Sequence, residues 1–172
     1  MLLTLLRHGA AMELKDLPPG PDGRLPVDDE RPLTDRGRRR LKKAARGLRR
    51  LRVRPDRILH SGLVRAKETA EVVAEGLEIE VPSFVEVAAL LPDAEPAELF
   101  SLLPTLGVEE VLCVGHAPNL DRVLAAVCNA EGRVISALGK AGAARLELPE
   151  PGAASGRLVW VLPPKLLRRV GE

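Results

Sequence analysis

The sequence predicts a three-layer α/β/α sandwich, in which helices cover both faces of a mostly parallel central sheet. Short apolar runs suited to buried parallel strands alternate along the chain with segments of helical periodicity, which is typical of such folds. The last two apolar runs follow one another across a short turn, so we expect an antiparallel pair to close the sheet. With 172 residues, the chain can bury one sizeable core, and a single domain over residues 1–172 is expected.

The first strand is predicted at residues 2–6, where an apolar run is suited to burial on both faces of a sheet. Residues 10–32 follow, rich in proline and acidic side chains, and we expect them to form a surface loop. Loops of this length commonly have a function or move. Two roles are open for it: charge balance against the basic helix that follows, or a lid that shapes the substrate site.

Turn residues and helical spacing predict the remaining elements. Thr34 is a suitable N-cap for a helix that starts at Asp35 and ends before Pro55, and Asn119 is a suitable cap for a later helix. In chain order, the other predicted elements are a strand at 57–60, a helix reaching residue 77, a short strand at 79–81 with a loop to Asp93, a helix at 95–103, a strand at 111–114, and closing strands at 144–148 and 158–162.

The basic residues are concentrated in one segment. Residues 35–57 contain twelve Lys and Arg against two Asp, a net charge of +10, whereas the whole chain carries only +2. Such a block is typical of a surface that binds nucleic acid or an acidic partner, but also of the polar face of an amphipathic helix. No aromatic residue lies among the cations to stack on bases, so we expect no specific nucleic-acid partner. A basic binding module remains the alternative function of another class.

The two cysteines, Cys113 and Cys128, are too few for a disulfide framework, which is typical of a reducing compartment. No apolar run approaches the ~20 residues needed to cross a membrane. We therefore expect a cytoplasmic protein with no membrane partner. Four residues separate Cys128 from Arg133, whereas five separate the cysteine from the arginine in the cysteine phosphatase loop. This spacing argues against a thiolate mechanism. The sequence contains no cluster of metal ligands, so neither a metal nor another cofactor is expected.

Cationic and imidazole side chains follow three of the predicted strands. Arg7 and His8 come after the first, Arg65 lies in the turn region after the second, and His116 follows the strand at 111–114. The carboxyl ends of parallel strands meet at one edge of a sheet, so these side chains should lie together. Two arginines and two histidines there predict a pocket for a dianionic oxyanion, because guanidinium forks match phosphate oxygens. Gly9 lets the backbone turn sharply and approach a bound group.

These motifs resemble those of the histidine phosphatase (phosphoglycerate-mutase-like) superfamily. Leu6-Arg7-His8-Gly9 is similar to its Arg-His-Gly signature. Three further blocks, at residues 33–37, 61–70 and 114–118, are similar to its other motifs and occur in the same order. The resemblance runs from residue 3 to about residue 148, and the small size resembles the SixA-type protein phosphohistidine phosphatases. It implies a phosphoglycerate-mutase-like fold and a phosphatase activity that needs no metal.

The resemblance also implies roles for individual residues. His8 would be the nucleophile and become transiently phosphorylated, while Arg7, Arg65 and His116 would hold the transferring phosphoryl group. A neutral imidazole is an adequate nucleophile near neutral pH, since its reference pKa is about 6.5. Adjacent cations should lower the pKa of both histidines in the empty pocket.

The chain departs from the larger members of the superfamily at the general acid. The region that carries this acid in those members is short here, at residues 86–95, where Asp93 is the best candidate and Glu86 and Glu95 come next. An enzyme without an acid should prefer a leaving group that departs easily, which favours a phosphohistidine protein as the substrate. A small-molecule phosphomonoesterase, acting on a sugar or nucleotide phosphate, is the alternative within the enzyme class.

Overall fold

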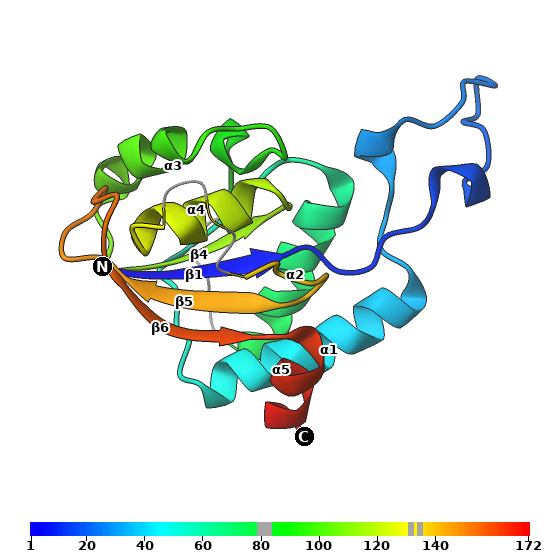
Figure 1. Cartoon of the computed structure of the whole chain (residues 1–172). Helices are drawn as coiled ribbons and strands as arrows, with labels where there is room; N and C mark the ends of the chain where they lie inside the picture. Colours follow the sequence, from blue (N-terminus) through cyan, green and yellow to red (C-terminus); the bar gives the residue numbers. More distant parts are fainter. Residues whose placement is uncertain (79–83, 131–132, 134–135) are drawn as a thin grey trace.

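The computed structural model describes residues 1–78, 84–130, 133 and 136–172. Within these ranges one sheet forms the middle layer of the molecule, with strand order β3-β2-β4-β1-β5-β6 (Figure 1). The strands are β1 (Leu2–Arg7), β2 (Arg57–His60), β3 (Phe84–Glu86), β4 (Glu110–Gly115), β5 (Ala143–Glu147) and β6 (Arg157–Leu162). β3, β2, β4 and β1 are parallel, and β5 and β6 join antiparallel, as predicted.

Helices cover both faces of the sheet (Figure 1), which confirms the predicted α/β/α sandwich. The α-helices are α1 (Asp35–Arg50), α2 (Val64–Leu77), α3 (Pro96–Leu102), α4 (Asn119–Val127) and α5 (Pro164–Val170). α1, α2 and α5 pack on one face, and α3 and α4 pack on the other. β1 supplies both cores, because Leu3 and Leu5 face α4 whereas Leu6 faces α1 and α2. An apolar run on successive residues is therefore required there.

α1 is amphipathic, and its polar face explains part of the basic segment. Thr34 caps the helix as predicted, with its hydroxyl accepting a hydrogen bond from the Gly37 amide at 2.9 Å. Leu41, Ala44, Ala45 and Leu48 are fully buried on the face that packs against the sheet and α2. On the outer side, α1 forms ion pairs with α2 through Arg38–Glu68, Lys42–Glu75 and Arg49 with Glu78, the residue after α2.

Three details differ from the sequence-based expectations. The strand predicted at 79–81 lies outside the described residues, while β3 forms in the segment expected to be a loop because its backbone pairs with β2. Asn119 does not cap α4 but is its first residue, and its side-chain amide donates to the Ala94 carbonyl at 2.7 Å. α5 has no counterpart among the predicted elements. It approaches α1 so closely that a Cβ at Gly47 would lie 2.2 Å from the Leu167 carbonyl oxygen.

Residues 10–32 form the expected loop, which extends away from the sheet (Figure 1). It contains two short 3-10 turns, Leu14–Asp16 and Asp28–Glu30, and an isolated bridge between Ala11 and Leu33 closes its base. Among the helices in the described ranges, none is long and apolar enough to span a bilayer.

Candidate active site

The strand order brings the predicted site residues together. β2, β4 and β1 are neighbours, so their carboxyl ends lie side by side. The imidazole rings of His8 and His116 are 4.8 Å apart between centroids and tilted by 47°. The backbone fixes this pair, because the His8 amide donates to the Gly115 carbonyl at 3.0 Å.

The His8 ring is held in a defined orientation and tautomer. His8 is 5% exposed, and its Nδ1 lies 2.7 Å from the carbonyl oxygen of Gly9. A carbonyl can only accept a hydrogen bond, so in the neutral ring the proton is on Nδ1 and Nε2 keeps its lone pair. The Gly9 amide donates to the Thr69 hydroxyl at 3.0 Å, which in turn donates to the Arg65 carbonyl at 2.6 Å.

Gly9 packs closely against two leucine side chains. Gly9 does not have a positive φ, so no special turn geometry demands it. A Cβ built there would lie 2.5 Å from Cδ1 of Leu41 and 3.1 Å from Cδ2 of Leu33. The glycine therefore allows the end of β1 to pack directly on α1.

His116 has a partner that the sequence analysis did not identify as a site residue. Its Nε2 lies 2.7 Å from the Ser61 hydroxyl, and both residues are buried. Ser61 follows β2 immediately and is the first residue of the similar block at residues 61–70, which is the sequence signal that could have identified it. The hydrogen bond fixes the orientation of the His116 ring.

Arg65 is engaged by an anion from the chain itself. Its side chain is 5% exposed, and its two terminal nitrogens donate to Asp28, one to the carbonyl oxygen at 2.7 Å and one to the carboxylate at 2.9 Å. Asp28 thus offers Arg65 two oxygens in the paired arrangement that a phosphate would use. Asp28 also forms an ion pair with Arg31 at 3.0 Å. Arg7 uses one terminal nitrogen to donate to the Leu138 carbonyl at 2.8 Å.

These contacts bear on the two roles considered for the 10–32 loop. The ion pairs of its carboxylates join Glu30 to Arg24, Glu13 and Asp28 to Arg31, and Asp28 to Arg65. In the part of the chain that the structure describes, none of these pairs reaches α1, so the contacts do not indicate charge balance against the basic helix. Three of the pairs lie within the loop, and the fourth, Asp28–Arg65, attaches the loop to the candidate phosphoryl site.

Burial makes both histidines hard to protonate. Burial, followed by the charges of Arg65 and Arg7, lowers the pKa of His8 to about 4. Burial, followed by the charges of His8, Arg65 and Arg7, lowers the pKa of His116 to about 3. The direction agrees with the sequence-based expectation, although burial has a larger effect than the cations. Both rings are neutral at neutral pH, so His116 acts there as a hydrogen-bonding group without a charge.

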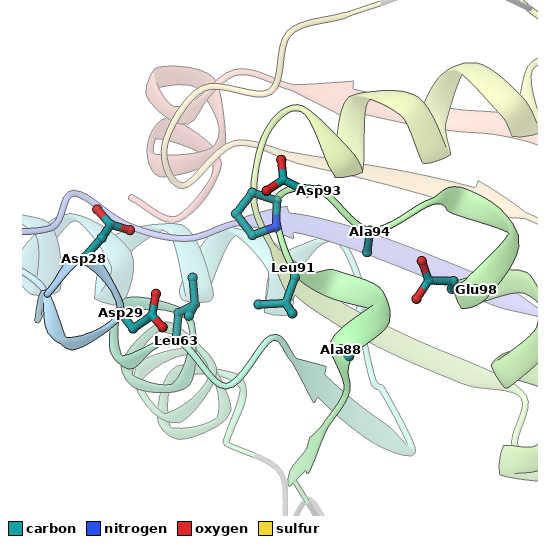
Figure 2. Close-up of a pocket in the computed structure, with 9 residues that line it drawn as sticks. Asp28, Asp29, Leu63, Ala88, Leu91, Asp93, Ala94 and Glu98 are labelled. Atoms are coloured by element: carbon teal, nitrogen blue, oxygen red, sulfur yellow. The ribbon is translucent and has the colours of Figure 1, made fainter.

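The three candidate acids occupy different places. Asp93 lines a cavity of about 510 Å³ together with Asp28, Asp29, Glu98 and apolar side chains such as Leu63 (Figure 2). Asp28 and Asp29 come from the 10–32 loop, and Asp93 lies across the cavity from them. The other candidates have different neighbours. Glu86 packs against Gly62, and Glu95 precedes α3 and pairs with Arg122 at 3.4 Å.

The lowered pKa values predict how stability depends on pH. Between about pH 6.5 and pH 4 the unfolded chain binds protons that folded His8 and His116 do not bind, so the free energy of unfolding should fall as pH falls. The loss approaches about 1.4 kcal/mol per pH unit for each histidine. Urea unfolding at pH 6.5, 5.8 and 5.0 measures it, with the His116→Gln variant for comparison. His60, whose pKa burial also lowers, adds a contribution of the same sign. A pH dependence in the variant as steep as in the wild type would contradict the account.

The comparisons with known proteins agree with this geometry. The family model of the histidine phosphatase superfamily (branch 1) matches residues 3–87. The solved structure of the protein histidine phosphatase SixA complexed with tungstate is 27% identical, with a TM-score of 0.80 over 97% of this chain and 99% of that chain. The ecdysone phosphate phosphatase from Bombix mori, 16% identical with a TM-score of 0.64, covers 95% of this chain and 92% of its own, and shares the fold.

Curated relatives match over a shorter region. The serine/threonine-protein phosphatase Pgam5, mitochondrial, of Drosophila virilis is 29% identical over 99 residues, which are 55% of this chain. The same protein of Drosophila yakuba is 32% identical over 88 residues. The chain spans less than a third of the length of these curated relatives. The family model, the SixA likeness and the ordered motifs agree, and the chain belongs to the histidine phosphatase superfamily.

Proposed function

We propose that this protein is a phosphatase that forms a phosphohistidine intermediate on His8. The observation that supports it best is the hydrogen bond from His8 Nδ1 to the Gly9 carbonyl, which leaves the Nε2 lone pair available for attack. The ring is neutral at working pH and has two permanently charged arginines close enough to lower its pKa. This is the combination that nucleophilic attack on a phosphoryl group requires.

The proposed reaction has two displacements. His8 Nε2 attacks phosphorus in line, the bond from phosphorus to the leaving group breaks, and the leaving group departs with its electron pair and gains a proton. Water then attacks the phosphohistidine, the P–N bond breaks, and orthophosphate and neutral His8 are released. Arg7 and Arg65 stabilise the negative charge on the equatorial oxygens, and His116, oriented by Ser61, donates to one of them. The imidazole supplies the nucleophile itself, so no step is assigned to a metal.

Asp93 is the proposed proton donor to the leaving group. Asp93 lines the same cavity as Asp28, which contacts Arg65. Glu86 and Glu95 are not among the residues that line it. Glu95 is engaged with Arg122, and Glu86 lies beside Gly62. Asp93 is therefore the residue whose place best fits a leaving group bound next to the arginines.

A phosphohistidine protein is the proposed substrate. The support is the likeness to the protein histidine phosphatase SixA, which aligns over nearly the whole of both chains. A small phosphate ester is the second candidate, because the cavity of about 510 Å³ whose lining residue Asp28 contacts Arg65 has the size of a small-molecule site. We propose no specific nucleic-acid or membrane partner, and a cytoplasmic location remains a prediction.

The proposal predicts a loss of turnover in the His8→Asn variant. Removing the nucleophile should reduce kcat/KM for an aryl phosphate at least about 10³-fold, and chelation with EDTA should change nothing. His60→Asn is a matched control, since His60 is equally buried but accepts a hydrogen bond from the Gly62 amide, and it should retain most activity. Retained activity in His8→Asn, or inactivation by EDTA, would contradict the proposal. Phosphohistidine protein and small esters are then compared by kcat/KM to identify the substrate class.

The contact of Asp28 with Arg65 predicts competition with the substrate phosphoryl group. The Asp28→Asn variant removes the carboxylate charge from Arg65, so KM for a phosphate substrate should fall. The Asp28 side chain is 60% exposed, which limits the effect to about two- to fivefold. Steady-state kinetics measure it, with Asp16→Asn as a control of equal charge change in the same loop. An increased KM in Asp28→Asn would show that Asp28 helps to bind the substrate.

A further inference from the structure

Part of the basic segment is not explained by the packing of α1 on α2. Arg38, Lys42 and Arg49 pair with carboxylates of α2 or of the residue after it. Lys43 pairs with Glu172 at 3.0 Å. The cations in the first turns behave differently, since Arg36, Arg39 and Arg40 take part in no ion pair with any described residue. The same holds for Arg46, Arg50, Arg52 and Arg54, toward and beyond the carboxyl end of α1, so cations without an ion-pair partner among the described residues lie at both ends of the helix.

Arg40, near the amino end of α1, lines a second cavity. It has a volume of about 360 Å³ and lies between the start of α1, residues 140–141 and the start of α5. Four of the side chains that line it are basic, namely Arg40, Lys140, Lys165 and Arg168, and the described lining contains no carboxylate. The rings of Pro163 and Pro164 and the backbone of Gly37 provide the rest of the wall. We call this space the basic cavity.

Like charges at the basic cavity repel one another. The charge of Arg36, and to a lesser extent that of Arg168, lowers the pKa of Arg40. The Glu172 carboxylate accepts a hydrogen bond from Lys43, which lowers its pKa more than the charge of Arg168 does, and Glu172 does not line the cavity. Cations from three separate parts of the chain therefore line this cavity without a carboxylate in the described lining, and a bound anion would offset their mutual repulsion.

We propose that the basic cavity binds a small polyanion, of the class of inorganic or organic polyphosphates. Two guanidinium groups and two ammonium groups converge there, and guanidinium forks match phosphate oxygens. The volume fits a small molecule, and the proline rings offer an apolar wall for an organic moiety. A polyphosphate carries negative charges on adjacent phosphate groups, so one molecule can contact several of the four cations at once. The inference does not depend on the phosphatase activity.

The basic cavity is distinct from the candidate active site but adjoins it. None of Arg7, His8, Arg65 and His116 lines it. The two places share a backbone connection, because the Ala141 amide donates to the carbonyl oxygens of Arg7 and His8 at 3.0 and 3.1 Å. An anion in the cavity would therefore contact the segment that supports the end of β1.

Calorimetric titration with inorganic tripolyphosphate at about 0.15 M salt tests the proposal. The double variant Arg40→Gln/Lys165→Gln removes two exposed cations of the cavity and should weaken binding about tenfold or more. Arg52→Gln/Arg54→Gln is the matched control, with the same charge change beyond the other end of α1, and should bind as the wild type does. Arg65→Gln, which removes an active-site cation, should also retain the binding.

Several results would overturn the proposal. Equal weakening in both double variants would mean that only the net charge matters, and loss confined to Arg65→Gln would assign the tripolyphosphate to the active site. Absence of binding by the wild type at this salt concentration would refute the site directly. A DNA duplex that displaces tripolyphosphate and binds more tightly at the same salt concentration would replace the small polyanion with a nucleic acid.

Discussion

The parallel pairing of β1 with β4 is the constraint on which the rest of the site depends. In this register Leu6 lies opposite Val114 and Arg7 opposite Gly115, so His8 and His116 both follow directly after the paired strands. A shift of one residue would turn the side chains of β1 to the opposite faces and exchange its contributions to the two cores. The apolar residues that β1 buries on both faces therefore also fix the distance between the two imidazole rings.

Burial and charge act together at the carboxyl end of the sheet. Burial keeps both imidazole rings neutral, whereas the arginines are cations. The site therefore combines uncharged ring nitrogens with fixed positive charge. The empty site carries an unbalanced positive charge, and the Asp28 carboxylate partly neutralises it by bonding to Arg65. This contact gives the acidic loop a specific attachment to the site, and it is weak enough, on an exposed side chain, for a phosphoryl group to replace it.

The fold could be predicted from the sequence because local patterns and the core agree. The structure confirms that the apolar run of β1 is buried, as are Leu41, Ala45 and Leu48 on one face of α1. It also confirms that Thr34 caps α1. β3 was missed because a three-residue strand depends on its pairing with β2 rather than on its own pattern. α5 is a helix of only seven residues and depends on its packing against α1.

Prediction of the candidate site was limited in a different way. The convergence of Arg7, His8 and His116 follows from the topology of parallel strands, so motif order was sufficient to predict it. The contacts of Ser61 with His116 and of Asp28 with Arg65 join residues 55 and 37 positions apart, and no local pattern encodes them. The close packing of Gly9 against Leu41 is likewise a tertiary contact.

The central claim is that His8 carries the phosphoryl group during turnover. Rapid quenching at alkaline pH, followed by tandem mass spectrometry of the peptides, locates a transferred phosphoryl group while preserving an acid-labile P–N bond. We expect the phosphoryl group on His8. The phosphorylated fraction should be larger when attack of water on the phosphohistidine is slower than its formation. A label on His116, His60 or Ser61, or turnover without any label on the protein, would contradict it.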